Sequence, residues 1–502
     1  MKWSTRAQER LGFALLAVAF AGVGYSAIAA LLPKRTLTIA VREGVESVAL
    51  KKVAQRFSEE RGITVKVQEF LYDDLFKKEL KEVRSDKSRF DVLMVDDPWM
   101  PALLITEKEK DSGQQQYGLK EVQRDTYEQE DGINDFSPME SVAAYCEAST
   151  GCNHYYGVPY VGNSQLFCYR TDVPNAARVA QSWEQIRARS TQQHKSLGYV
   201  ARIGPNNSIV TDFMPILWSY DPKALPVHPE AQSAFGSEED AVNAFLSMAE
   251  LVQNEKSSSV SVDDFDVAAY LATGKASMGI VWSAWAMALA KIERARGTST
   301  IHCDAMPGGK QELGAWLLSI PNTARMQDEA EEFIRYATSR EQLMIATIDG
   351  NPPPRISILR ELSGSTIPAS RVHTVAAEEG NTPQQQSTEC LPGDSDGKKY
   401  QECMNAIPAH LREEYGDLFA SEYRSLTTAR PRPRSRCWRE MENILTQHLE
   451  PLILSNYKGE PLRKKALDAL RAANRELQEK IKTCSTTSLQ GNVAESQQLS
   501  SR

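Results

Sequence analysis

The sequence predicts an α/β fold built on a parallel sheet, and three observations lead to that class. The chain has 502 residues, enough for two or three domains of ordinary size. Hydrophobic residues make up 41% of it and charged residues 25%, so it can bury sizeable cores. Near its N-terminus, strand-like runs alternate with helix-like runs, the pattern of a parallel sheet covered by helices.

The alternating unit has the order β-α-β-α-β. Strands are predicted, from β-rich or alternating runs, at residues 36–41, 63–70 and 90–95. Between them, apolar residues recur at helical spacing over 45–57 and 72–83. In such open sheets, ligands bind outside the carboxyl ends of the strands. Those ends are residues 42–44, 71–73 and 96–99.

Further along, the chain becomes more helical. A strand-turn-strand is predicted at 156–170, strands at 278–281 and 313–320, and helices at 183–188, 212–218, 238–252, 265–272, 326–337 and 340–348. Two more amphipathic helices follow, at 437–454 and 461–482. The run Arg430–Arg436 (RPRPRSR) is interpreted as a stiff, exposed connector, because its alternating prolines forbid a helix.

A long uncharged segment lies near the N-terminus. Residues 11–32 carry no charge and follow three basic residues, Lys2, Arg6 and Arg10, which predicts membrane targeting. The 22 residues are enough to span a bilayer, whereas the triplet at 27–29 (AIA) resembles a cleavage site. A cleaved signal peptide and an uncleaved anchor both remain open, and both imply export.

Eight cysteines in an exported chain favour disulfide bonds, which persist in oxidising compartments. The pairs closest in sequence are Cys146 with Cys152 and Cys390 with Cys403, and these are the expected bridges. The alternative is that some of the eight are buried free thiols. No metal site is expected, since the sequence has no CxxC motif and its 7 histidines are scattered.

Charge and motifs argue against two classes of function. The formal net charge of −8 provides no overall basic field to hold a phosphate backbone, so no nucleic-acid partner is expected. The hydrolase motifs GxSxG and HExxH do not occur. Asp96 and Asp97 are adjacent, and neighbours on an extended chain point to opposite faces and cannot flank one glycosidic bond. We therefore expect neither an enzyme nor a cofactor.

Several stretches resemble one protein family in the same order along the chain. They are LTIAVREGVESVALKKVAQRFSEERGITVKVQEF, FDVLMVDDPWM, YGVPYVGNSQLFCYRTDV, YLATGKASMGIVWSAW, and GAWLLSIPNTA followed by GNPPPRISIL. Together they resemble the bacterial extracellular solute-binding proteins of the sugar-binding family 1, the maltose-binding-like receptors of ABC importers. The resemblance covers about residues 36–359.

The resemblance implies a two-lobe periplasmic binding protein fold of type II-like topology, with extra C-terminal helices here. Its segments would be 1–35, signal peptide or anchor; 36–165, first α/β lobe; 166–310, second, more helical lobe; 311–382, return crossing and packing helices; 383–436, polar insertion and connector; 437–484, C-terminal helices; 485–502, disordered tail.

The implied function is capture of a carbohydrate between the lobes by a monomeric receptor, periplasmic or extracellular, and its delivery to the permease subunits of an ABC importer. Two alternatives remain: a sensor ectodomain that reports ligand to a membrane signalling partner, and an exported carbohydrate-active enzyme. Sugar sites combine aromatic faces with polar side chains. Carried over residue by residue, the ligand-binding candidates are Glu43, Gly44, Tyr72, Asp73, Asp97, Trp99, Asn163, Trp218, Trp282, Trp285, Gly314, Trp316, Asn351 and Arg355.

Overall fold

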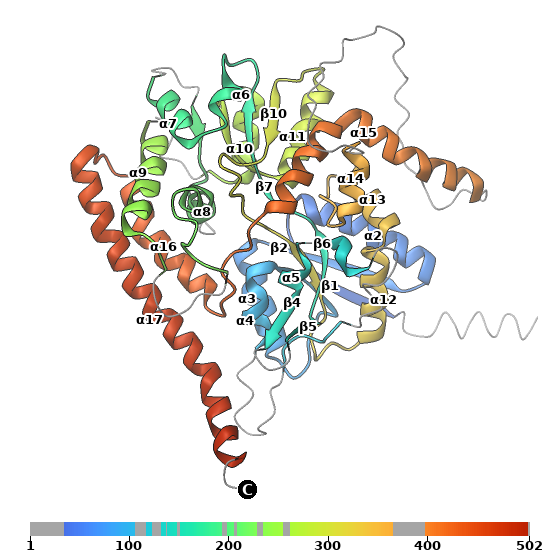
Figure 1. Ribbon diagram of the computed structural model, residues 1–502. Helices are drawn as coiled ribbons and strands as arrows, with labels where there is room; N and C mark the ends of the chain where they lie inside the picture. The colour runs from blue at the N-terminus through green and yellow to red at the C-terminus, as the bar shows by residue number, and fades with distance from the viewer. Residues whose placement is uncertain are drawn as a thin grey trace, which may run out of the picture.

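The structure is a computed structural model with two main sheets, each covered by helices (Figure 1). It describes residues 35–105, 117–122, 132–136, 138–147, 151–192, 198–204, 208–227, 234–254, 262–364 and 397–499. We call the part built on the five-stranded sheet lobe 1 and the part built on the four-stranded sheet lobe 2. The predicted α/β class is confirmed.

The sheet of lobe 1 has the strand order β2-β1-β3-β11-β6. Its strands are β1 (Thr36–Arg42), β2 (Thr64–Phe70), β3 (Val92–Asp96), β6 (Val158–Val161) and β11 (Trp316–Ser319). β1 pairs in parallel with β2 and β3, as the alternation predicts. β11 enters the sheet from lobe 2 and runs antiparallel to both of its neighbours, so the whole sheet is mixed.

Burial along these strands explains their sequences. The central residues of β1 are all buried, because this strand has neighbours on both sides and is covered on both faces. β2 lies at the sheet edge, and its exposure alternates. The helices of lobe 1 are α2 (Val45–Arg61), α3 (Tyr72–Val83), η1 (Asp97–Trp99), α4 (Met100–Leu104), η4 (Ile133–Phe136), α5 (Glu140–Ala143), α12 (Gln327–Ala337), α13 (Arg340–Ile348), α14 (Ile356–Leu362) and α15 (Gly397–Thr428). A short pair, β4 (Ala144–Glu147) and β5 (Gly151–Tyr155), adjoins them.

The sheet of lobe 2 has the order β10-β7-β9-β8. Its strands are β7 (Gln165–Arg170), β8 (Tyr199–Val200), β9 (Met278–Trp282) and β10 (Ile301–Asp304). Cys168 of β7 lies opposite Cys303 of β10 in the antiparallel register, and the two form a disulfide. This bridge fixes an edge strand to the sheet.

Helices make up most of lobe 2. They are α6 (Ala176–Val179), α7 (Trp183–Gln192), α8 (Ser208–Tyr220), α9 (Glu238–Asn254), α10 (Asp264–Thr273), α11 (Ser283–Ala295), α16 (Trp438–Ile453) and α17 (Gly459–Leu499). The last two lie beside α9 at the left of Figure 1 and supply part of the same apolar core, through Trp438 and Leu470 for example. The C-terminal helices therefore belong to lobe 2. A disulfide joins Cys437 to Cys484.

Three crossings connect the lobes, and their backbones are hydrogen-bonded side by side. The crossings are residues 162–164, 305–315 and 429–437. Backbone bonds of 2.9 Å each run from Gly314 N–H to the Asn163 carbonyl, from Leu313 N–H to Arg430, and from Arg430 N–H to Gln311. These segments form the connection between the two lobes, which we call the hinge.

Two expectations differ from the structure. The connector 430–436 is not exposed throughout: it is the third crossing, and Arg432 within it is only 5% exposed. α17 continues to Leu499 and takes in most of the tail expected to be disordered, since extending an existing helix avoids a second nucleation. The structure does not describe the leader at residues 1–34 or most of the insertion 383–403. It also does not describe the side chains of the expected disulfide partners Cys146, Cys152, Cys390 and Cys403.

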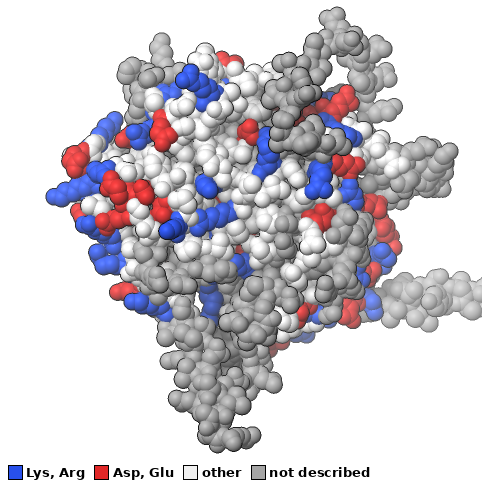
Figure 2. Space-filling view, in the orientation of Figure 1, with Lys and Arg blue, Asp and Glu red and all other residues white. Residues whose placement is uncertain are grey.

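The surface carries both signs of charge. On the face in Figure 2, basic and acidic side chains are interspersed, with no continuous field of one sign. Among the residues that the structure describes, no helix combines the length and the apolar character needed to cross a bilayer.

Candidate ligand-binding site between the lobes

The carboxyl edge of the lobe 1 sheet gathers several predicted residues. β1 ends at Arg42, α3 begins at Tyr72 directly after β2, and Asp97 and Trp99 follow β3. Parallel strands β2, β1 and β3 lie side by side, so their carboxyl ends meet. Glu43 is exposed there, beside Gly44 at the start of α2.

An aromatic cluster forms the wall behind this edge. The ring centroids of Tyr72 and Trp99 are 4.7 Å apart, and those of Trp99 and Trp316 are 5.7 Å apart, in an edge-on arrangement. Trp99 is 1% exposed and Trp316 3%. The cluster brings three predicted residues together, but its two indoles are buried, with little surface free to stack on a sugar.

Lobe 2 contributes the end of β9 and the start of α11. Trp282 ends β9 and is buried, whereas Trp285 is half-buried and contacts the ring of Phe265. Gly314 lies against Trp282: a Cβ there would come within 2.6 Å of the indole Cζ3, so only glycine allows this approach. The Asn163 side chain accepts a hydrogen bond from the Ala284 N–H at 3.3 Å.

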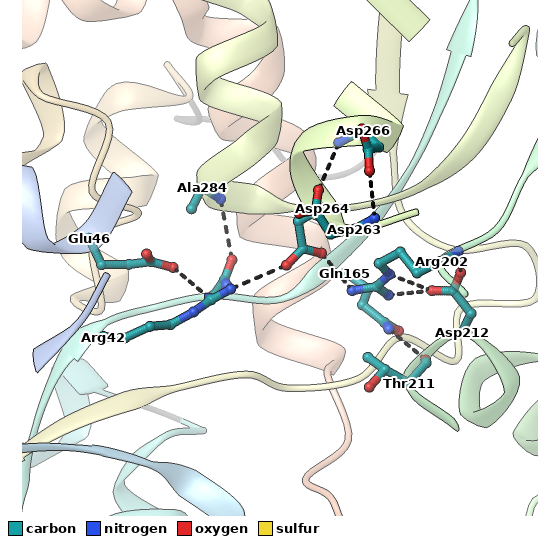
Figure 3. A network of polar contacts seen from close by, with 11 residues as sticks. Arg42, Glu46, Gln165, Arg202, Thr211, Asp212, Asp263, Asp264, Asp266 and Ala284 are labelled. Carbon is teal, nitrogen blue, oxygen red and sulfur yellow. Dashed lines mark hydrogen bonds and ion pairs between the residues drawn. The ribbon is translucent and has the colours of Figure 1, made fainter. Parts of the chain in front are cut away.

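A chain of ion pairs joins the lobes (Figure 3). Arg42 of lobe 1 donates from Nη2 to Asp264 Oδ2 at 3.3 Å, and Arg202 of lobe 2 donates from Nη1 to Asp264 Oδ1 at 2.9 Å. Arg202 is held in turn by Asp212, which accepts from its Nε at 2.8 Å. The carboxylate of Asp264 therefore lies between two guanidinium groups, one from each lobe.

Each of these guanidinium groups lies over an indole. The Cζ of Arg42 is 5.6 Å from the ring centroid of Trp316, and the Cζ of Arg202 is 5.6 Å from that of Trp282. Such contacts are favourable because the ring face is electron-rich. The groups that meet between the lobes are thus guanidinium groups and carboxylates, with the indoles behind them.

A second buried cation lies at the hinge. Arg432 donates to Asp96 at 2.6 Å and to Asp97 at 3.4 Å, and its Nε lies 3.1 Å from Glu312 Oε1. Burial raises the pKa of Asp97 to about 7, although Arg432 opposes the shift. Burial also raises the pKa of Glu312 well above its usual range. The third crossing thus inserts a charge among carboxylates of lobe 1 and of the second crossing.

A further ion pair crosses from lobe 1 to the C-terminal helices. Arg439 of α16 pairs with Asp73 of α3 and with Glu442 on its own helix, the latter at 2.7 Å. Its Cζ lies 5.2 Å from the ring centroid of Tyr72, whose hydroxyl donates to Asp96 at 2.6 Å. Asp73 thus lies at the junction of the lobes, as its position after β2 suggested.

Three predicted residues lie outside the junction of Arg42, Asp264 and Arg202, although Arg430 of the third crossing lies over the ring of Trp218 at 4.4 Å. Trp218 is fully buried in α8, where its indole N–H donates to the Ala224 carbonyl at 3.0 Å. Arg355 is 1% exposed and pairs with Asp135 at 3.2 Å. Asn351 donates to the Tyr160 carbonyl at 2.9 Å. Because all three are buried within a lobe, we leave them out of the candidate site.

A surface groove of about 1650 Å³ lies elsewhere, between α11, β10 and α15. Lys291, His302 and Glu414 are among its lining residues, and none of the predicted ligand residues is. Within the described part of the chain, no cluster of three or more His, Cys, Asp or Glu side chains is placed to hold a metal ion.

Sequence reasoning missed the charged residues that join the lobes. Arg42 ends the first strand, so its position at the carboxyl edge of the sheet could have been predicted from the sequence. The alternating prolines around Arg432 indicated a stiff connector, but its charges suggested exposure. Arg202 and Asp264 are far apart in the chain and carry no local motif, so no signal joined them.

The fold is shared with solved sugar- and polyol-binding proteins. Maltose-bound T. maritima MalE3 is 17% identical, with a TM-score of 0.58 over 87% of this chain and 99% of that one. An ABC transporter solute-binding protein from Thermotoga lettingae bound to α-D-tagatose is 15% identical, with a TM-score of 0.62 over 89% and 100%. One from Agrobacterium radiobacter bound to ribitol is 16% identical, with a TM-score of 0.59 over 88% and 99%. At these identities the likeness establishes the fold.

Comparison of the sequence with family profiles identifies the family to which the chain belongs. No curated protein matches the chain. The profile of the family described as "Bacterial extracellular solute-binding protein" matches residues 52–364, which is more than half of the chain. This chain belongs to the bacterial extracellular solute-binding proteins.

Proposed function

We propose that this protein is an exported receptor that binds a carbohydrate or polyol between its lobes and delivers it, chemically unchanged, to an ABC importer. The observation that carries the proposal is the junction at which Arg42 of lobe 1 and Arg202 of lobe 2 reach one carboxylate. A solute placed there contacts both lobes at once. The maltose, tagatose and ribitol bound by structures of the same fold support a hydroxylated ligand.

Binding acts by a population shift. A ligand that touches both lobes binds the closed form more tightly than the open form, and it shifts the equilibrium by that difference in affinity. The hydrogen-bonded crossings 162–164, 305–315 and 429–437 are the hinge about which the lobes move. The permease then recognises the closed arrangement.

The proposed ligand contacts come from both lobes and the hinge. Trp282 and Trp316 shape the site behind the guanidinium groups, and Asp73, Asp97 and Asn163 supply polar atoms at its edge. The remaining members of the set are Glu43, Gly44, Tyr72, Trp99, Trp285 and Gly314.

We further propose that the protein acts outside the cytoplasm as a monomer, either free or tethered by its N-terminal segment. The uncharged run at residues 11–32 after three basic residues supports export. Blotting of membrane and soluble extracts with an antibody against the folded part distinguishes the two forms. Retention in the membrane fraction supports the anchor, and release of a shortened chain supports cleavage.

Calorimetric titration with a panel of neutral sugars, polyols and sugar acids tests ligand binding. We expect saturable binding with a dissociation constant on the order of micromolar. Trp282→Ala should weaken binding at least tenfold, whereas Trp218→Phe, in the core of lobe 2, should leave the affinity unchanged. Turnover of a panel member would show an enzyme, and absence of binding across the panel would contradict the proposal.

Delivery to an importer is tested separately. Two genes for multispanning permease subunits beside the gene for this chain would support import, and uptake of the bound solute should stop when this gene is deleted. A neighbouring histidine-kinase gene, with uptake unaffected by the deletion, would instead identify a sensor ectodomain.

A further inference from the structure

Two guanidinium groups converge on the Asp264 carboxylate from opposite lobes. Arg42 reaches Oδ2 at 3.3 Å from the end of β1, and Arg202 reaches Oδ1 at 2.9 Å from the segment after β8. Each arginine uses one terminal amino group for this contact. The pair forms a carboxylate clamp, by which we mean Arg42 and Arg202 together.

The clamp is held in place without Asp264. Arg202 donates its backbone N–H to Asp212 at 2.7 Å and its Nε to the same carboxylate at 2.8 Å. Arg42 contacts Glu46 at 3.4 Å through its other amino group. The indoles of Trp316 and Trp282 lie beneath the two guanidinium groups. The orientation of the clamp is thus fixed by its surroundings.

Asp264 is not needed for the start of α10. The capping box there consists of Asp263 and Asp266: the Asp263 side chain accepts from Asp266 N–H at 3.0 Å, and the Asp266 side chain accepts from Asp263 N–H at 3.1 Å. Asp264 follows the cap, and its side chain is 20% exposed. Its carboxylate can therefore leave the clamp without loss of the helix.

The clamp is also reachable from solvent on the lobe 1 side. The Arg42 side chain is 21% exposed, whereas the Arg202 and Asp212 side chains are 4% and 1% exposed. Phe265, next to Asp264, is 61% exposed. Arg42 and Asp264 therefore lie at the solvent-accessible edge of the junction.

We propose that the solute is a sugar acid, and that its carboxylate takes the place of the Asp264 carboxylate between Arg42 and Arg202. This inference rests on the proposed function and specifies the ligand of that same site. A carboxylate accepts hydrogen bonds from two arginines with charge-assisted strength. One negative group held by both lobes would couple binding directly to closure.

Charge explains why an acid suits this site better than a neutral sugar. Inserting a solute between Arg42 and Asp264 separates an ion pair that joins the lobes. Arg42 then keeps Glu46 and Arg202 keeps Asp212, but each guanidinium loses its hydrogen bond to a charged acceptor, which a neutral hydroxyl replaces only weakly. The carboxylate of an acid restores both charge-assisted hydrogen bonds, and its ring hydroxyls can then reach the polar atoms at the carboxyl edge of the sheet.

Calorimetric titration of the exported chain tests the proposal, with hexuronates and aldonates each paired with the corresponding neutral sugar or alditol. We expect at least one acid to bind about tenfold or more tightly than its neutral counterpart. Asp264→Asn removes the internal competitor and should tighten acid binding several-fold. Arg42→Gln should weaken acid binding about tenfold and binding of the matched neutral compound by a smaller factor, so that the preference for the acid falls. Arg424→Gln, in an exposed pair with Asp304, is the matched control and should change nothing.

The outcomes separate this inference from the proposed function. Binding of neutral sugars with no preference for acids would overturn the sugar-acid proposal and leave the receptor intact, as would weaker acid binding by Asp264→Asn. Preference for a cationic amino sugar would also overturn it. Failure of every acid and every neutral compound to bind would contradict both. Circular dichroism of the folded Asp264→Asn and Arg42→Gln variants ensures that lost binding is not lost structure.

Discussion

Arg432 donates from Nη2 to Asp96 Oδ1 across 2.6 Å, although 336 residues separate the two in the chain. The bond joins the third crossing to the carboxyl end of β3. Asp97 accepts from the same guanidinium, and Glu312 lies within ion-pair distance of it. One arginine thus pairs with three buried carboxyl groups where the crossings meet the lobe 1 sheet.

Removing this cation should destabilise the protein strongly. Arg432→Met keeps much of the side-chain length but leaves the buried carboxylates without a counter-charge, and breaking a buried pair in this way costs about 3–5 kcal/mol. Urea unfolding followed by tryptophan fluorescence measures the loss. Arg424→Met, whose partner Asp304 is 46% exposed, should cost less than about 1 kcal/mol. Equal effects of the two substitutions would contradict the role of Arg432.

Stability should fall as the pH rises towards 8. Glu422 of α15 is 2% exposed, neither of its carboxylate oxygens has a hydrogen-bond partner among the described residues, and burial raises its pKa to about 8. The folded state therefore holds a proton that the unfolded chain releases near its ordinary pKa of about 4.5. This contribution to stability is complete below that value and is lost as the pH rises through about 8.

Glu422→Gln should reduce this dependence. The free energy of unfolding should fall less steeply between pH 5 and pH 8 than in the wild type, by up to about 1.4 kcal/mol per pH unit. Asp97, with a pKa of about 7, contributes in the same direction, so some slope remains. Glu413→Gln, on the exposed face of the same helix, should leave the slope unchanged. An unaltered slope in Glu422→Gln would show that the proton resides elsewhere.

The disulfide between Cys437 and Cys484 should stabilise the C-terminal helices. It closes a loop with a sequence separation of 47, and such a bond typically contributes about 2–4 kcal/mol by restricting the unfolded chain. The double variant Cys437→Ser/Cys484→Ser should lose that amount in thermal or urea unfolding, with unchanged helix content. A variant as stable as the wild type would mean that the bond contributes nothing.

Gly314→Ala should disturb Trp282 and the binding of solute. The added Cβ would lie 2.6 Å from Cζ3 and 2.9 Å from Cη2 of the indole, so the ring must move. Overpacking of this kind costs about 1–3 kcal/mol. Tryptophan emission should shift and solute affinity should fall. Gly416→Ala, whose Cβ would meet nothing closer than 3.7 Å, is the control. An unshifted emission in Gly314→Ala would contradict the contact.

Local pattern predicts most of the helices and strands in this protein. α3 spans Tyr72–Val83 and α13 spans Arg340–Ile348, as their apolar spacing indicates. The carboxyl ends of the first strands also place Tyr72, Asp97 and Trp99 together, since parallel pairing aligns them. The helix and strand predictions depend only on residues close in sequence, whereas the meeting of the strand ends depends on the parallel pairing.

The charged junction could not be predicted in the same way. Whether Arg432 is buried depends on Asp96 and Glu312, and whether Arg42 meets Asp264 depends on how the lobes approach. A charged run in a proline-rich segment is usually solvated, and that general tendency gave the wrong interpretation here. The indoles were predicted to face the solute, but the sequence does not show that guanidinium groups cover them.

The threefold passage of the chain between the lobes has a consequence for biogenesis. β11 completes the lobe 1 sheet only after most of lobe 2 has been made, and α16 and α17 complete the core of lobe 2 last. Neither half is a contiguous piece of polypeptide that can fold to completion while the remainder is still being synthesised. A chain that stops before Trp438 leaves apolar surface of lobe 2 uncovered.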